Sequence, residues 1–159
     1  MRRSLSFRIT GQTLHGAVIT LLLGTAMAEA CRREQVLARQ GDLIITGAYA
    51  HPSAGDAGAA YVRFRNAGSA PDTLIGVNGP DPAMAMLMGT TGGRMKVLPP
   101  LVINQGEQVM MQPGGMHLML GGLTAEYKIG DTLRLTLTFA RAGQIRIAAP
   151  VLPFGEMPE

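Results

Sequence analysis

The sequence predicts an all-β protein that folds as one β-sandwich of the Greek-key type. The chain has 159 residues, enough for one domain of ordinary size and too few for two. Its 21 glycines and 10 prolines are scattered between short apolar runs, which is typical of short strands joined by tight turns. After the N-terminal segment no stretch has helical periodicity. We therefore expect roughly eight or nine antiparallel strands.

The expected strands follow from alternating or short apolar runs bounded by turn residues. In "AYVRFRN", Tyr61, Arg63 and Arg65 alternate with Val62 and Phe64, as in a half-buried strand. We expect strands over residues 42–50, 60–66, 73–77, 83–88, 94–97, 109–111 and 116–120, followed by a closing hairpin over 128–151. In this hairpin one face carries Leu133, Leu135, Leu137 and Phe139.

The composition limits both the core and the partners. Hydrophobic residues make up 47% of the chain, but there is no tryptophan and only four phenylalanines and three tyrosines, so the core must be aliphatic and methionine-rich. Much of the basic charge behind the net +3 lies near the beginning, in Arg2, Arg3, Arg8, Arg32 and Arg33. Because no basic stripe alternates with aromatic residues, we expect no nucleic-acid partner.

The first 30 residues have the layout of a secretory signal peptide. Arginines precede the short apolar run 17–23, and small residues end the segment at Ala28 and Ala30. The run is too short for the roughly 20 residues that span a bilayer. We therefore expect residues 1–30 to be removed on export to the periplasm, with no stable membrane insertion afterwards.

The only cysteine, Cys31, directly follows the expected cleavage site. A lipid-modified N-terminal cysteine is one alternative, but Glu29 is an unfavourable residue so close to such a site. We expect instead a lone thiol, either in a flexible N-terminal segment (31–41) or lost with the signal, and no disulfide framework. The sandwich is expected over 42–152 and a C-terminal tail over 153–159.

A methionine and histidine pattern marks the candidate site. In "PGGMHLMLGGL", Met116, Leu118 and Leu120 share one face of a strand, while His117 and Met119 share the other. Met84, Met86 and Met88 also recur at period two. Many of the methionines, Met110 among them, are expected to be packing residues, because methionine fills irregular gaps.

Spacing and chemistry distinguish four of these residues from simple packing. Ten residues separate Met84 from Met95, twenty-one separate Met95 from His117, and Met119 follows after Leu118. Thioether and imidazole ligands suit Cu(I), whereas zinc, calcium and magnesium prefer thiolates, more imidazoles or oxygens. The pattern therefore predicts a Cu(I) site, and it leaves open whether Met86 or Met88 replaces Met84.

These residues resemble the motif of the periplasmic copper chaperones of the PCuAC family: His or Met, ten residues, Met, twenty-one residues, then His-x-Met. The motif falls on Met84, Met95, His117 and Met119. The resemblance extends over residues 42–151 and includes "AGAAYVRFRNAGSAPDTLIGV" and "GDTLRLTLTF". Two departures stand out: Met84 replaces the commoner histidine, and Tyr49-Ala50-His51 replaces a common Trp-Ala-Arg run.

The resemblance implies a cupredoxin-like sandwich that binds Cu(I). It also implies delivery of the ion to the cytochrome c oxidase subunit that carries the binuclear copper centre, with another copper chaperone as a further candidate partner. Such a protein is not an enzyme. With Met84 in place of histidine, the ligand set of three thioethers and one imidazole is expected to bind Cu(II) poorly.

Three other functions fit parts of the sequence. A blue-copper electron carrier needs a cysteine thiolate with two histidines, and residues 42–151 contain no cysteine. A hydrolytic metalloenzyme needs an acid–base residue, and no Asp or Glu lies between Met84 and Asn104. The serious alternative is an exported β-sandwich that binds a protein partner through a methionine-rich surface without metal.

Overall fold

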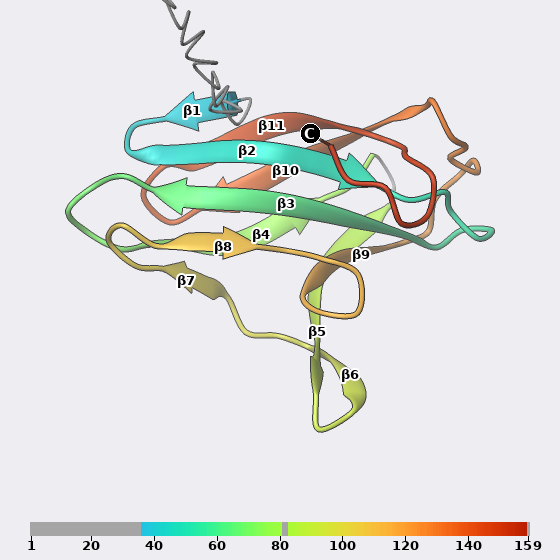
Figure 1. Ribbon diagram of the computed structural model, residues 1–159, viewed down its shortest axis with the longest axis horizontal. Helices are drawn as coiled ribbons and strands as arrows, with labels where there is room; N and C mark the ends of the chain where they lie inside the picture. The colour runs from blue at the N-terminus through green and yellow to red at the C-terminus, as the bar shows by residue number, and fades with distance from the viewer. Residues whose placement is uncertain (1–35, 81–82, 159) are drawn as a thin grey trace, which may run out of the picture. The chain divides into compact units, whose positions relative to one another are not determined.

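The computed structural model describes residues 36–80 and 83–158, and this part of the chain is a single antiparallel β structure (Figure 1). The predicted signal peptide and Cys31 lie outside the described residues. No helix long and apolar enough to cross a membrane occurs in the described part. The strands are β1 (Val36–Gln40), β2 (Leu43–Ala50), β3 (Gly58–Asn66), β4 (Asp72–Asn78), β5 (Met84–Thr91), β6 (Arg94–Val97), β7 (Leu101–Ile103), β8 (Gln108–Met110), β9 (His117–Gly121), β10 (Thr132–Phe139) and β11 (Gly143–Pro150).

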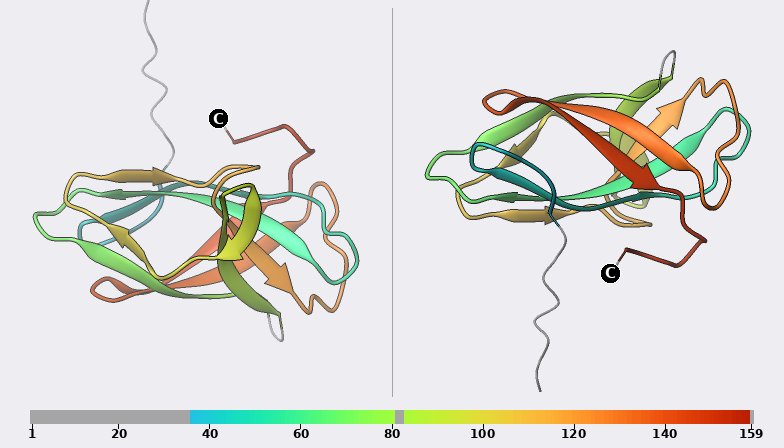
Figure 2. Two further views of the ribbon diagram at one scale, coloured as in Figure 1. Left: turned by 90° about the horizontal axis from the view of Figure 1, so that it is seen from below. Right: turned by 90° about the horizontal axis from the view of Figure 1, so that it is seen from above.

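The hydrogen-bonded strand order is β1-β2-β3-β9-β5-β4-β10-β11, with β6 beside β5, β7 beside β4 and β8 beside β3. All of these pairings are antiparallel. The sheet folds over, so that β2 and β3 lie in one layer and β4 and β10 in the other (Figure 2). The prediction of an all-β, cupredoxin-like sandwich is confirmed.

The closing hairpin shows why alternation predicts this fold. In β10 the side chains of Leu133, Leu135, Leu137 and Phe139 are all buried. The intervening residues are exposed or half-buried, so one face of the strand packs on the core. Phe139 pairs with Gly143 of β11, whose positive φ of 76° suits glycine at the turn.

Two strands were missed by the sequence analysis. β1 lies within the segment 31–41 that was expected to be flexible, and its residues are mostly exposed. It is held by main-chain pairing with β2 and therefore needs no apolar alternation. β7 follows Pro99 and Pro100 and has only three residues, so its single fully buried side chain, Ile103, sets no period.

Candidate metal-binding face

The strands β9 and β5 each have a core face and an outer face. Leu118 and Leu120 of β9 are completely buried, so His117 and Met119, which alternate with them, point to the opposite side of the sheet. Likewise Ala85 and Leu87 of β5 pack against the core. The methionines of the strand alternate with these two residues and therefore lie on the outer face; they are Met84, Met86 and Met88.

The register between β5 and β9 determines which outer side chains meet. Met86 lies directly opposite Met119, and Met88 lies directly opposite His117. Met84 lies opposite Gly121, which has no side chain, and is therefore only a diagonal neighbour of Met119. Directly opposed residues of an antiparallel pair share a face, with Cβ atoms roughly 4.5–5.5 Å apart.

Met95 reaches the same face from β6. It pairs with Thr90 of β5, while Val97 pairs with Met88. Because Met84, Met86, Met88 and Thr90 alternate along one side of β5, Met95 shares their side of the ladder. The β5–β6 hairpin extends away from the neighbouring strands (Figure 1). Met95 is thus separated from β9 by the width of β5.

The four sequence-predicted ligands share one side of the ladder, but the register does not bring all four together, because Met84 and Met95 are aligned with positions six residues apart along β5. Two further thioethers lie between them. We call the set of six the outer methionine face; its members are Met84, Met86, Met88, Met95, His117 and Met119. Their coordination of a metal stays a prediction. Sequence periodicity alone placed Met86 and Met88 on the same side as Met84, but the strand register was needed to place them opposite β9.

Exposure separates this face from the packing methionines. Met84 is 69% exposed, Met95 58% and Met86 40%, whereas Met111 is buried in the core. The three exposed side chains do not fill the core, so packing does not explain them. Met110 was expected to be a packing residue, and this is wrong: it is exposed, and Arg63 Nη2 approaches its Sδ at 3.4 Å.

His117 is fixed by a backbone contact. Its Nδ1 lies 3.0 Å from the carbonyl oxygen of Gly115. Because a carbonyl only accepts, Nδ1 carries the proton and donates it, which leaves the lone pair on Nε2. Among residues 36–80 and 83–158 no hydrogen-bond partner is found for Nε2. Metal-binding histidines are oriented by this kind of contact through the other ring nitrogen.

The turn before β9 supports this orientation. Gly115 N–H donates to the carbonyl of Gln112, and Gln112 N–H donates to the carbonyl of Met116. Gly114 has a φ of 78° in this turn, a conformation that glycine adopts without strain. The Thr90 hydroxyl donates to the Gly114 carbonyl at 3.4 Å, which links β5 to the same turn. As a whole residue, His117 is only 8% exposed.

An aromatic cluster borders His117 on the other side, and the sequence analysis did not identify it. The Tyr61 ring lies 6.4 Å from the His117 ring and stacks on Tyr49 at 4.8 Å. His51 contacts Tyr61 at 5.2 Å and is covered by Phe154 of the C-terminal segment at 4.9 Å. The departure from the common Trp-Ala-Arg run at residues 49–51 was the available signal.

The cluster holds polar atoms in an apolar setting. Burial raises the pKa of the Tyr49 phenol, with a further increase from Tyr61 and a smaller opposing effect from Arg63. Burial also raises the pKa of Tyr61. The Tyr49 hydroxyl and His51 Nε2 are buried without a hydrogen-bond partner. A buried polar group without a hydrogen-bond partner lowers the stability of the folded protein. Substitutions in this cluster should therefore change the free energy of unfolding.

The donor set of the outer methionine face suits a soft ion. In the described part of the chain, no three His, Cys, Asp or Glu side chains lie close enough together to hold a metal. β5, β6 and β9 contain no carboxylate at all. Neutral thioethers with one imidazole favour Cu(I) over zinc, calcium or magnesium.

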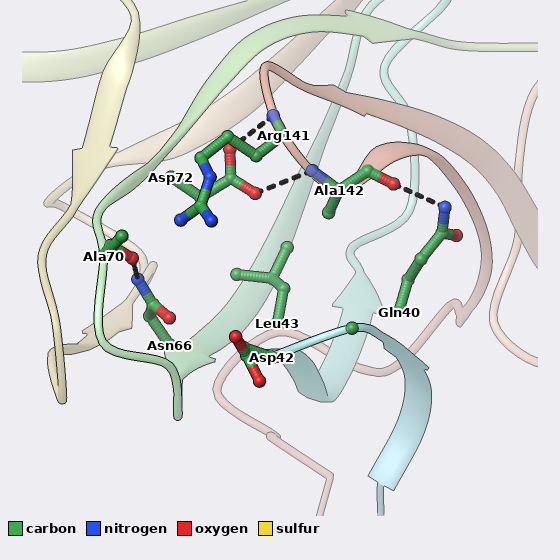
Figure 3. Close-up of a pocket in the computed structure, with 9 residues that line it drawn as sticks. Gln40, Asp42, Leu43, Asn66, Ala70, Asp72, Arg141 and Ala142 are labelled. Carbon is green, nitrogen blue, oxygen red and sulfur yellow. Dashed lines mark hydrogen bonds between the residues drawn. The ribbon is translucent and has the colours of Figure 1, made fainter.

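A polar pocket of about 290 Å³ beside the β1–β2 turn is structural (Figure 3). The Asp72 carboxylate accepts hydrogen bonds from the backbone N–H groups of Thr73, Arg141 and Ala142. It thereby ties the beginning of β4 to the β10–β11 turn. The Asn66 amide donates to the carbonyls of Ala70 and Ile103. These polar groups are occupied in holding loops together.

Comparison with known proteins identifies one matching family model and several similar solved structures. Residues 43–151 match the family model described as "Putative lipoprotein LpqE-like". A search of curated proteins finds no match. Similar solved structures include the copper-bound PCuAC domain from PmoF2, with 23% identity, a TM-score of 0.64 and coverage of 73% of this chain and 97% of that one.

Two further structures extend the comparison. The solution structure of CuI-DR1885 from Deinococcus radiodurans has 28% identity and a TM-score of 0.59, covering 82% of this chain and 87% of that one. The apo PCuAC domain from PmoF1 has 22% identity and a TM-score of 0.65, covering 72% and 96%. The matched region covers at least 87% of each of the three solved chains.

Proposed function

The chain belongs to the PCuAC family of copper chaperones, and on this premise we propose that it carries Cu(I) as cargo on the outer methionine face. The proposed ligands are the four motif residues, Met84, Met95, His117 and Met119. One observation carries the proposal: a histidine whose Nδ1 is held by Gly115 faces the thioethers with Nε2 available. The DR1885 and PmoF2 structures, described as Cu(I)-loaded and copper-bound, support this choice of ion.

The exposure of the ligands suits a carrier. The thioethers of Met84 and Met95 are more than half exposed, whereas His117 is buried. A partner can therefore approach the ion from the methionine side and replace thioethers one at a time, while the imidazole still holds it. Thioethers also stay available in an oxidising compartment, where paired thiols form disulfides.

We extend the proposal to export and delivery. The signal-like residues 1–30 support export to the periplasm, and so does the lipoprotein description of the matching family. The proposed recipient is the cytochrome c oxidase subunit with the binuclear copper centre, as for the resembling chaperones. Intact-mass analysis of the secreted protein tests the first part: a chain that retains residues 1–30 contradicts export with cleavage.

Anaerobic Cu(I) titration against a colorimetric chelator tests the binding. The natural chain is expected to compete for Cu(I), and the His117→Ala variant is expected to bind far more weakly. Met157→Leu is the matched control, because Met157 is 57% exposed but belongs to the C-terminal segment after β11, not to the strands that carry the proposed ligands. If the natural chain takes no Cu(I), the metal-free protein-binding module is the better account.

A further inference from the structure

The outer methionine face holds more soft donors than one ion needs. Besides the four motif residues it carries Met86 and Met88, and the register makes these two the residues directly opposite β9. Met86 opposes Met119, and Met88 opposes His117. The motif explains neither of these opposed pairs, although direct opposition is the closest arrangement that two strands offer.

Each opposed pair has a third donor diagonal to it. Met84 is diagonal to Met119 and adjoins Met86 on the same side of β5. Met95 pairs with Thr90, so it is diagonal to Met88. Diagonal neighbours lie roughly 7–8 Å apart, still within reach of long side chains. Two groups of three result: an outer trio of Met84, Met86 and Met119, and an inner trio of Met88, Met95 and His117.

The two trios differ in chemistry. The outer trio contains only thioethers, and two of its members, Met84 and Met86, are at least 40% exposed. The inner trio contains the imidazole of His117, fixed by Gly115. All six donors are neutral with His117 in its Nε2 lone-pair form, so neither trio favours a divalent ion by its charge, and soft donors select Cu(I) in both.

We propose that the outer methionine face binds two Cu(I) ions, one in each trio, with Met86 and Met88 as additional ligands. The inference rests on the proposed function, because it assumes that the face binds Cu(I). The register places Met84 and Met95 six residues apart along β5, so the first ion is held at His117 by the inner trio and a second equivalent fills the outer trio. Solvent around the exposed thioethers screens the repulsion between the two ions.

Stoichiometry tests the inference directly. The full chain is titrated anaerobically with Cu(I) against a competing chelator, beside Met86→Leu, Met88→Leu and Met157→Leu. We expect two equivalents for the natural chain and for Met157→Leu, and one equivalent for Met86→Leu and for Met88→Leu. Leucine is close to methionine in volume, so both variants are expected to fold, which circular dichroism checks.

The outcomes separate this inference from the proposed function. One equivalent in the natural chain, with the same affinity in Met86→Leu, overturns the second site and leaves the carrier intact. Two equivalents that survive in both Met86→Leu and Met88→Leu also overturn it. No Cu(I) binding by the natural chain removes both proposals. A second equivalent that adds only sulfur scatterers to the X-ray absorption spectrum supports the outer trio.

Discussion

The two faces of β5 and β9 use the same strands for different purposes. On the core side, Leu118, Leu120 and Leu87 pack against the rest of the sandwich. On the outer side, the same strands present thioethers and one imidazole, of which Met84 and Met86 are substantially exposed. One face therefore contributes stability and the other carries the proposed ligands, so substitutions on the two faces should have separable effects.

The largest expected effect is on the core side. Leu118→Ala removes a completely buried side chain, so it should lower the free energy of unfolding by about 2–5 kcal/mol. Chemical denaturation measures this change. The folded fraction should keep the Cu(I) affinity of the natural chain, and a large loss of affinity in folded Leu118→Ala would contradict the separation of the two faces.

His117→Ala should show the opposite of Leu118→Ala: Cu(I) affinity should fall, while the free energy of unfolding changes little. Loss of the only nitrogen donor on the face should weaken Cu(I) binding by about 100-fold, equivalent to about 2.7 kcal/mol. Chelator competition measures the change, and unchanged affinity in the variant would make His117 a structural residue.

Met84→His should change the selectivity between Cu(I) and Cu(II) more than it changes the free energy of unfolding. An added imidazole makes the ligand set harder, so the affinity for Cu(II) should rise relative to that for Cu(I), by about tenfold or 1.4 kcal/mol. Met84→Leu is the control for loss of the thioether alone. Competition with chelators for each oxidation state measures the ratio. Stronger Cu(II) than Cu(I) binding by the natural chain would count against the assigned ligands.

The smallest expected effect concerns the aromatic cluster beside His117. Tyr49→Phe removes a buried hydroxyl that has no partner, so it should raise the free energy of unfolding by about 1 kcal/mol. The pKa of Tyr49 is raised in the folded protein, so the unfolded chain loses its phenolic proton first. Stability should therefore fall as the pH rises above about 10.

The Tyr49→Phe variant should lose less stability than the natural chain over this alkaline range. Urea denaturation at pH 8 and pH 10.5 compares the two proteins. Tyr61 also has a raised pKa, so part of the alkaline loss should remain in the variant. Equal losses in both proteins would show that Tyr49 does not contribute.

Sequence alternation predicted the parts of the fold in which one face of a strand is buried. β10 is the clear case, because its leucines and Phe139 all enter the core. Alternation did not predict β1, because this exposed edge strand is held by its backbone pairing with β2. The contact of His51 with Phe154 was also beyond reach, since it depends on how the C-terminal segment returns to the end of β2.

The candidate site, like the fold, was predictable from the sequence only in part. Period two placed Met84, Met86 and Met88 on one side of a strand, and the motif spacing selected four candidate ligands. Neither could specify that Met86 rather than Met84 opposes Met119, because this depends on the register between two strands distant in sequence. The hydrogen bond of His117 to Gly115 likewise required the geometry of the turn before β9.

The X-ray absorption spectrum of the chain loaded with one equivalent of Cu(I) tests the central claim most directly. If the outer methionine face holds the ion, sulfur scatterers should outnumber nitrogen, and a single imidazole should contribute. His117→Ala should then lose the imidazole signal while the sulfur signal remains, with Met157→Leu unchanged. A spectrum with only nitrogen and oxygen scatterers around the ion would contradict the claim.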